Sequence, residues 1–274
     1  MSVFDEPKID CHAHILDPGR FPYDPAIAYH PSGQEIGTVG QMRHMMDCYG
    51  IRHTLLVQPN SGYGSDNSYL LSEVSADRSR FRGAAIVSLD AGHDMLASLR
   101  AQGVIGVAFN PSLLGTDFYA NAGPLLERLA ELDMVLNLQV EGDQIGMFAP
   151  WIRSIPVRVL IDHCGRPSLD AGLAQPGFTT LLDLAQTERV WVKVSGYSKF
   201  SRQRFPFEDC WPYVEALKQT FTPGRLVWSS DWPYLRAPDR QDVGPLLRLA
   251  ESFFPETEAR GRVFWHTPRS LLGF

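Results

Sequence analysis

The stretch KIDCHAHILD, residues Lys8–Asp17, is a short and largely apolar run that contains two histidines, His12 and His14. A run of this length and character is typical of a buried strand. Alternate side chains of a strand lie on the same face, so this spacing predicts that both imidazoles point the same way. A single histidine at a strand end is usually only a hydrogen-bonded cap, but two on one face favour a functional site.

Seven further runs of this kind follow along the chain: RHTLLVQP, FRGAAIVSL, VIGVAFNP, MVLNLQV, VRVLIDH, VWVKVSG and LVWSSDWP. Most are continuously apolar, as expected of strands that are covered on both faces. Amphipathic segments separate them, for example Gly40–Tyr49, Asn67–Ala76, Asp94–Gln102, Gly123–Leu132 and Phe178–Gln186. This alternation predicts an α/β protein of parallel βαβ units, and eight strands close a TIM barrel. A doubly wound open sheet is the competing architecture, but no glycine-rich phosphate motif follows the first run.

Composition excludes several classes of partner. The chain has 274 residues and a formal net charge of −6, so it carries no basic field for nucleic acid. The acidic, proline-containing start MSVFDEPK is unlike a signal peptide, and no apolar run approaches the ~18 residues of a membrane helix. The four cysteines form no C-x-x-C pair, which is typical of a reduced, cytoplasmic protein. No linker interrupts the pattern, so we expect a single domain over residues 1–274.

Polar residues concentrate where the apolar runs stop. They include His12, His14, Gln58, Asn110, Gln139, Glu141, His163, Arg166 and Asp231. The functional groups of a TIM barrel gather at the carboxyl ends of its strands. A concentration of polar residues at this end is hard to explain as core filling, so we expect an active site there.

Three of these side chains have chemistry that suits catalysis. His163 can polarise a carbonyl or relay a proton, and Arg166 offers a planar fork for a carboxylate, with a solvated loop pair as the alternative. Asp231 lies between Trp228 and Trp232, so we expect its carboxylate to be partly desolvated and suited to act as a base or metal ligand. A turn-initiating aspartate before proline is the alternative for this residue.

Other polar residues give weaker signals. Asp162 precedes His163 on the opposite face of its strand, so we expect it either to support a catalytic residue from behind or to have a structural role. Lys193 lies inside an apolar run and is predicted with equal weight to face inward or outward. Further candidates for substrate contact lie in polar loops: Tyr23, Ser61, Tyr63 and Asn67. Of these, Asn67 also fits the N-cap of the following helix.

Together these motifs resemble the amidohydrolase superfamily, which has H-x-H on strand one, histidine after strand six and aspartate after strand eight. The closer resemblance is to the amidohydrolase-2 branch that contains 2-pyrone-4,6-dicarboxylate lactonase. The segments that carry it are RFPY, LVQPNSGYGSDNSYLL, VLIDHCGRPSLDAGLAQPGF, VWVKVSGYSKFS, RLVWSSDWPY and PRSLLGF. The resemblance spans nearly the whole chain, from Ile9 to Phe274.

This resemblance implies a distorted (β/α)8 TIM barrel that hydrolyses a small carboxylated lactone or similar cyclic ester. The matching catalytic positions are His12, His14, His163 and Asp231. The positions expected to bind an anionic substrate are Arg166, Tyr23, Ser61, Tyr63, Asn67, Gln139 and Lys199. The lactonase branch works without metal, so the resemblance implies that no cofactor is required.

The sequence also departs from the family in ways that bear on metal and substrate. No bridging lysine or glutamate ends the fourth run, and Gln139 stands where related sequences have histidine, so a two-metal site is not expected. Ala108 and Lys199 stand where the lactonase branch has arginine. Losing one such charged hydrogen bond costs roughly 1.5–3 kcal/mol. We therefore expect a related substrate with fewer carboxylates.

Three functions remain as hypotheses. In the first, Asp231 activates water, His12, His14 and His163 polarise the lactone carbonyl, and Arg166 orients a carboxylate. The second is a mononuclear zinc-dependent hydrolase or decarboxylase, in which His12, His14 and Asp231 hold one Zn²⁺ or Mn²⁺. The third is a catalytically silent barrel that binds a small acid.

Overall fold

Eight parallel strands form the centre of the molecule, and the computed structural model describes residues 2–274. Each strand pairs with the next one in sequence order. The strands are β1 (Lys8–Ala13), β2 (Ile51–Val57), β3 (Phe81–Ala85), β4 (Val104–Phe109), β5 (Val135–Leu138), β6 (Arg158–Ile161), β7 (Val190–Val194) and β8 (Leu226–Trp228). They lie in the eight predicted apolar runs, so the predicted (β/α)8 TIM barrel is confirmed.

Backbone hydrogen bonds close the barrel between β1 and the segment after β8. The Asp231 N–H donates to the His12 carbonyl at 3.0 Å, and the His14 N–H donates to the Trp232 carbonyl at 2.8 Å. Ala13 and Trp232 form a parallel bridge between the same segments. Closure therefore brings both histidines of β1 and its extension next to Asp231.

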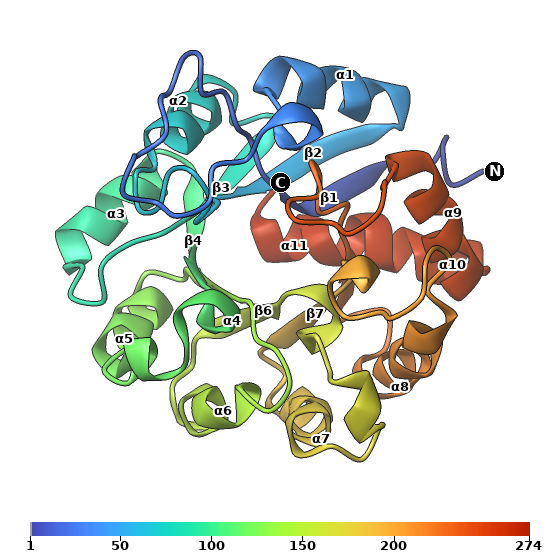
Figure 1. The fold of residues 1–274 in the computed structure, drawn as a ribbon. Helices are drawn as coiled ribbons and strands as arrows, with labels where there is room; N and C mark the ends of the chain where they lie inside the picture. The colour runs from blue at the N-terminus through green and yellow to red at the C-terminus, as the bar shows by residue number, and fades with distance from the viewer. Residues whose placement is uncertain (1) are drawn as a thin grey trace.

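Helices surround the strands, as Figure 1 shows. They are α1 (Val39–Cys48), α2 (Ser68–Ala76), α3 (His93–Ala101), α4 (Pro111–Leu114), α5 (Gly123–Glu131), α6 (Ile145–Ser154), α7 (Pro176–Asp183), α8 (Trp211–Phe221), α9 (Val243–Phe253), α10 (Thr257–Gly261) and α11 (Thr267–Leu272). Five of them, α1, α2, α3, α5 and α7, overlap the amphipathic segments identified in the sequence. Across residues 2–274, no helix combines the length and apolar character needed to cross a membrane.

The last helix closes one end of the barrel. Apolar side chains fill the interior, among them Ile9, Leu55, Val135, Leu160 and Val227. Leu271 and Leu272 of α11 belong to the same cluster. Arg158, the first residue of β6, donates to the Leu271 carbonyl at 3.2 Å, which places α11 at the amino ends of the strands. The carboxyl ends are left for the site.

Candidate active site

A cavity of about 290 Å³ lies at the carboxyl ends of the strands. Most of its lining is polar and comprises His12, His14, Gln58, Asn60, Ser61, Asn110, Ser112, Asn137, Gln139, Asp162, His163, Arg166, Ser198, Lys199, Asp231 and Arg236. Convergent polar groups in a cavity of this kind fix the orientation of a small ligand. The cavity therefore suits a small polar molecule.

The four predicted catalytic residues meet around one oxygen atom. Oδ1 of Asp231 lies 3.6 Å from Nε2 of His163, 3.9 Å from Nε2 of His12 and 4.0 Å from Nε2 of His14. The other carboxylate oxygen, Oδ2, lies 3.2 Å from Nζ of Lys199. Three imidazoles and one ammonium thus surround a single carboxylate that is 4% exposed.

The backbone that presents these groups is held in an unfavourable conformation. Asp231 has a φ of 61° and His163 a φ of 51°, which is the left-handed region that non-glycine residues rarely adopt. Each such residue costs about 1–3 kcal/mol and persists only where its surroundings hold it. For Asp231 the surroundings include the buried carboxylate of Asp10, which accepts the N–H groups of His12 at 3.1 Å and Ser230 at 2.9 Å.

Burial and charge set the protonation of this cluster. Burial tends to raise the pKa of Asp231, but Lys199 and the three histidines together outweigh it and hold that pKa below its ordinary value. Burial also lowers the pKa of His14 to about 4 and that of His163 to about 3. At neutral pH the site therefore presents an ionised carboxylate beside two neutral imidazoles.

Hydrogen-bond partners assign the tautomer of His14. Its Nδ1 lies 2.8 Å from the Val57 carbonyl, which can only accept, so Nδ1 carries the proton. Nε2 of His14 then faces the cavity with a lone pair. It lies 3.2 Å from Nε2 of His12, which can donate to it. His14 is therefore a proton acceptor on the cavity side.

A buried lysine completes the assignment for His12. Nζ of Lys193, which is fully buried, lies 3.0 Å from Nδ1 of His12, 2.7 Å from Oδ1 of Asp162 and in hydrogen-bond contact with Oδ1 of Asn137. An ammonium has three donors and no acceptor, so its three hydrogens match these three acceptors. Nδ1 of His12 then accepts, and Nε2 carries the proton toward the cavity. Lys193 faces inward, one of the two orientations left open above.

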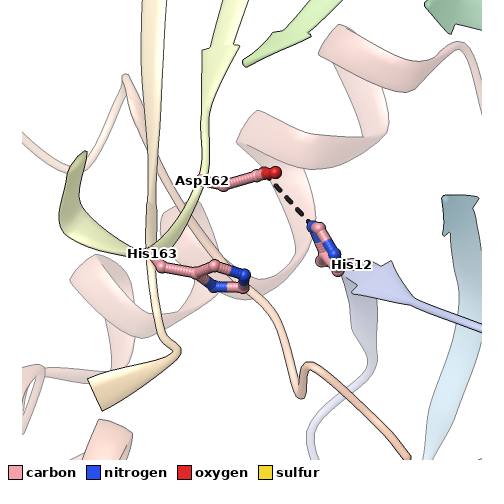
Figure 2. A group of neighbouring side chains, drawn as sticks. All are labelled: His12, Asp162 and His163. Atoms are coloured by element: carbon pink, nitrogen blue, oxygen red, sulfur yellow. Dashed lines mark hydrogen bonds and ion pairs between the residues drawn. The ribbon is translucent and has the colours of Figure 1, made fainter. Parts of the chain in front are cut away.

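Asp162 contacts His12 and Lys193, a supporting position like the one expected for it, although its side chain also reaches the cavity lining. Figure 2 shows its carboxylate facing His12, 3.2 Å from Nδ1, with the ring of His163 beside them. β6 ends at Ile161, and the chain then turns through the positive φ of His163, so strict strand alternation no longer applies. Burial tends to raise the pKa of Asp162, but Lys193 together with His12 and His163 outweighs it and holds that pKa well below its ordinary value.

His163 is positioned by two serines and a glycine. Ser229 Oγ donates to Ser195 Oγ at 2.6 Å, and Ser195 Oγ lies 3.4 Å from Nδ1 of His163. If Gly196 had a Cβ, it would lie 2.2 Å from the same Nδ1, so only glycine allows this approach. Ser195 donates to Nδ1, which leaves the Nε2–H of His163 directed at Asp231.

The opposite side of the cavity carries uncharged polar groups, which we call the neutral wall: Asn60, Asn110, Ser112 and Gln139. Ser112 Oγ donates to Asn110 Oδ1 at 2.7 Å, and Asn110 Nδ2 donates to Asn60 Oδ1 at 2.9 Å. Gln139 Nε2 donates to Ser112 Oγ at 2.9 Å and to Asn110 Oδ1 at 3.2 Å. The sequence signal for part of this wall was the pair of amides in VLNLQV, which share a strand face.

Arg166 connects the neutral wall to a surface carboxylate. Its Nη1 donates to Ser112 Oγ at 3.0 Å, and its Nη2 lies 2.9 Å from Oε2 of Glu141. Its buried Nε has no hydrogen-bond partner among residues 2–274. This nitrogen is enclosed by protein, so Arg166 lines the cavity with the rest of its side chain, which is 19% exposed.

The candidate substrate residues divide into two groups. Ser61, Gln139, Arg166 and Lys199 line the cavity. Tyr23, Tyr63 and Asn67 do not, because each is engaged with backbone: Tyr23 Oη donates to the Pro31 carbonyl, Tyr63 Oη accepts the Asp17 N–H, and Asn67 bonds both backbone groups of Ile86. These three residues hold loops around the cavity.

One group of donors has the geometry of a metal site. Nε2 of His12, Nε2 of His14 and Oδ1 of Asp231 lie within 4.8 Å of one another. His14 already has the tautomer of a metal-binding histidine, with Nδ1–H facing the Val57 carbonyl, whereas His12 would have to move its proton from Nε2 to Nδ1, where Asp162 could accept it. His12, His14 and Asp231 therefore fit one divalent ion. The positively charged ammonium of Lys199 beside Asp231 would repel a metal ion at this position, and this repulsion opposes metal binding.

An eight-stranded barrel with paired histidines on the first strand, histidine after the sixth and aspartate after the eighth defines an amidohydrolase-type enzyme. The model of the amidohydrolase family matches residues 9–274, and the chain belongs to this family.

Characterised relatives of this chain are lactone hydrolases. A 4-sulfomuconolactone hydrolase from Hydrogenophaga intermedia is 30% identical over 96% of this chain and 88% of its own length. A 2-pyrone-4,6-dicarboxylate hydrolase from Comamonas testosteroni is 26% identical over 96% of this chain and 89% of its own length. The chain is therefore an enzyme of a family whose members open cyclic esters.

Solved structures support the same fold. A Pseudomonas putida protein provisionally assigned as a 2-pyrone-4,6-dicarboxylic acid hydrolase is 31% identical, with a TM-score of 0.84 over 97% of each chain. A similarly assigned Acinetobacter baumannii structure contains citric acid and has a TM-score of 0.86 at 22% identity, over 98% of this chain and 100% of its own. A Burkholderia multivorans amidohydrolase with bound zinc has a TM-score of 0.75 at 19% identity, over 98% of this chain and 100% of its own. The last two likenesses concern the fold alone.

Proposed function

We propose that this protein hydrolyses a small carboxylated lactone, using Asp231 as the general base. The observation that carries the proposal is the convergence of three imidazoles and Lys199 on the ionised carboxylate of Asp231. The lactone hydrolases among its relatives support the same reaction. This arrangement also argues against a silent binding barrel, because binding alone does not need a base.

The proposed reaction begins with a water molecule beside Asp231. The water oxygen bonds to the lactone carbonyl carbon while Asp231 takes a proton, and the lone pair on Nε2 of His14 orients the same water. The Nε2–H of His12 and the ammonium of Lys199 stabilise the developing oxyanion. The ring C–O bond then breaks, and the ring oxygen takes the proton from Asp231, which gives an open hydroxy acid.

The three histidines therefore have different roles in the proposal. His12 donates to the oxyanion, as the sequence suggested. His14 presents a lone pair rather than a proton, so it supports the water instead of the carbonyl. His163 directs its Nε2–H at Asp231 and holds the carboxylate in place.

Arg166 supplies recognition of the substrate carboxylate. Its side chain lines the cavity and is 19% exposed, so its cationic guanidinium can pair with a carboxylate there. Ala108 adds no charge to the lining, and Lys199 already pairs with Asp231. The third cationic lining residue, Arg236, is exposed and its guanidinium stacks on Tyr29, so the inner part of the cavity favours one carboxylate over two.

The proposed reaction does not require a metal. A divalent ion held by His12, His14 and Asp231 would polarise a carbonyl or activate water, as in the zinc-dependent alternative. In the metal-free reaction, His12 and Lys199 already provide donors at the carbonyl. Gln139 on the wall opposite is a neutral amide, which is a poorer zinc ligand than the imidazole of related sequences.

A cytoplasmic location is part of the proposal. The four cysteines are free thiols, and three of them are buried. Disulfide-free domains are typical of reducing compartments.

The test is a panel of γ- and δ-lactones, with and without a carboxylate, followed by acid release with a pH indicator. We expect carboxylated lactones to be opened by wild type and not by Asp231→Asn. Failure of wild type to open any lactone of the panel faster than the variant would contradict the proposal.

A further inference from the structure

Arg166 contacts one end of the neutral wall at Ser112, and this contact sets the direction of the hydrogen bonds along the wall. Arginine has donors and no acceptor, so Ser112 Oγ accepts from Arg166 and directs its own hydrogen to Asn110 Oδ1. Asn110 Nδ2 then donates to Asn60 Oδ1. Both hydrogens of Gln139 Nε2 are also used within the wall.

Two polar atoms of the wall are left without a protein partner in the described part of the chain, residues 2–274. They are the donor Nδ2 of Asn60 and the acceptor Oε1 of Gln139. Both residues are half-buried and line the cavity. The neutral wall therefore offers a ligand one donor and one acceptor.

Hydroxyl groups match this pair of atoms. A hydroxyl accepts from the N–H of Asn60 and donates to the oxygen of Gln139, whereas a carboxylate or sulfonate has no hydrogen to donate. An anion there would also face the carbonyl oxygens of the wall. We propose, in an extension that rests on the proposed lactonase function, that the substrate is a lactone carrying ring hydroxyls in addition to its carboxylate.

The positions of the cationic side chains in the cavity agree with separate binding places for the carboxylate and the hydroxyls of the substrate. The cationic lining residues are Arg166, Lys199 and Arg236, and none of them belongs to the neutral wall. Arg166 stands at the end of the wall, where its guanidinium pairs with the carboxylate, while the hydroxyls lie along the wall itself. The lactone carbonyl then lies toward Asp231 on the opposite side of the cavity.

A matched pair of probes isolates the hydroxyls. The γ-lactone of a pentaric acid has one carboxylate and two ring hydroxyls, and the γ-lactone of α-hydroxyglutaric acid has the same ring and carboxylate without those hydroxyls. A site built to bond a hydroxyl rejects an analogue that lacks it, by roughly 10⁴-fold in favourable cases. We expect kcat/KM of wild type to be at least about 100-fold higher for one pentaric stereoisomer than for the deoxy lactone.

Two variants connect that preference to the wall. Asn60→Leu and Gln139→Met should each lower kcat/KM for the pentaric lactone by roughly 10-fold or more beyond any change for the deoxy lactone, the effect of one lost hydrogen bond to a ring hydroxyl. Gln102→Met, an amide variant at the amino end of β4, is the matched control and should change neither value. Circular dichroism and thermal unfolding verify that each variant is folded.

The outcomes separate the two proposals. Preference for the pentaric lactone that is lost in the wall variants supports the hydroxylated substrate. Equal or faster opening of the deoxy lactone by wild type, with every pentaric stereoisomer tried, overturns it and leaves the lactonase proposal standing. Failure to open these or any other carboxylated lactone overturns both.

Discussion

The ammonium of Lys199 lies 3.2 Å from Oδ2 of Asp231, so the proposed general base is one half of an ion pair inside the cavity. This pairing keeps a buried carboxylate ionised, although burial alone would favour its neutral form. It also places a cation beside the carbonyl that the water attacks. Lys199 thus links the protonation of the base to stabilisation of the oxyanion.

Removing Lys199 should shift the acidic limb of the pH profile, the pH range in which kcat/KM falls as the pH decreases. In wild type, the active form has ionised Asp231 and neutral His14, whose pKa is lowered to about 4, so kcat/KM should fall as pH decreases through about 4. In Lys199→Met, Asp231 loses the largest of the contributions that oppose burial, so its pKa rises and the limb should shift to higher pH. Lys218→Met, which removes a lysine paired with Glu215 on α8, is the control. An unchanged acidic limb in Lys199→Met would show that the ion pair with Lys199 does not keep Asp231 ionised.

Replacing Lys193 should change the tautomer of His12. Without the ammonium, Nδ1 of His12 takes the proton and donates it to Asp162, and the cavity loses the Nε2–H donor. Loss of one oxyanion donor costs roughly 10²–10³ in kcat. Nitrogen NMR of the histidine rings in Lys193→Met measures the tautomer directly.

A second variant separates this effect from instability. Lys193→Met leaves Asp162 as an unpaired buried carboxylate, which is strongly destabilising. Lys193→Met combined with Asp162→Asn removes the charge, and the new amide can donate to Nδ1 of His12. The double variant should regain the Nε2–H tautomer and part of kcat. A His12 spectrum that is the same in wild type and Lys193→Met would show that Lys193 does not set the tautomer.

Arg166 should affect binding according to substrate charge. Arg166→Met should raise KM for carboxylated lactones by about 10-fold or more and have little effect on neutral ones, since a hydrogen bond to a charged group contributes roughly 1.5–3 kcal/mol. Arg262→Met, an exposed arginine paired with Glu258, serves as control. Equal changes in KM for both substrate classes would mean that Arg166 only supports the neutral wall.

Chelation tests the proposed independence from metal. Activity should survive exhaustive treatment with a chelator, with residual metal measured by elemental analysis. His12, His14 and Asp231 could still bind an ion weakly, so a trace of metal without effect on rate agrees with the proposal. Loss of activity that stoichiometric Zn²⁺ or Mn²⁺ restores would establish the zinc-dependent alternative instead.

The barrel could be predicted from the sequence because its signals are local. Each strand is a short apolar run, and the histidines, Arg166 and Asp231 lie at or within five residues of the carboxyl ends of such strands. The carboxyl ends of parallel strands meet in space, so the convergence of His12, His14, His163 and Asp231 followed from topology.

The rest of the site depends on contacts that sequence spacing does not encode. Lys193 could have pointed to either side, and its direction is settled by Asn137 and Asp162 from neighbouring strands. Asp162 enters the site because the chain leaves strand geometry at His163. The neutral wall joins residues from three separate loops and strands, so its hydrogen bonds appear only in three dimensions.

The most direct measurement of the central proposal is kcat/KM of Asp231→Asn on the lactone that wild type opens fastest. The amide keeps the shape of the side chain but cannot take a proton, and loss of a general base costs roughly 10²–10⁴ in rate. We predict a decrease of that size in a variant whose circular dichroism and thermal unfolding match wild type. Activity near the wild-type value would contradict the role of Asp231 as the base.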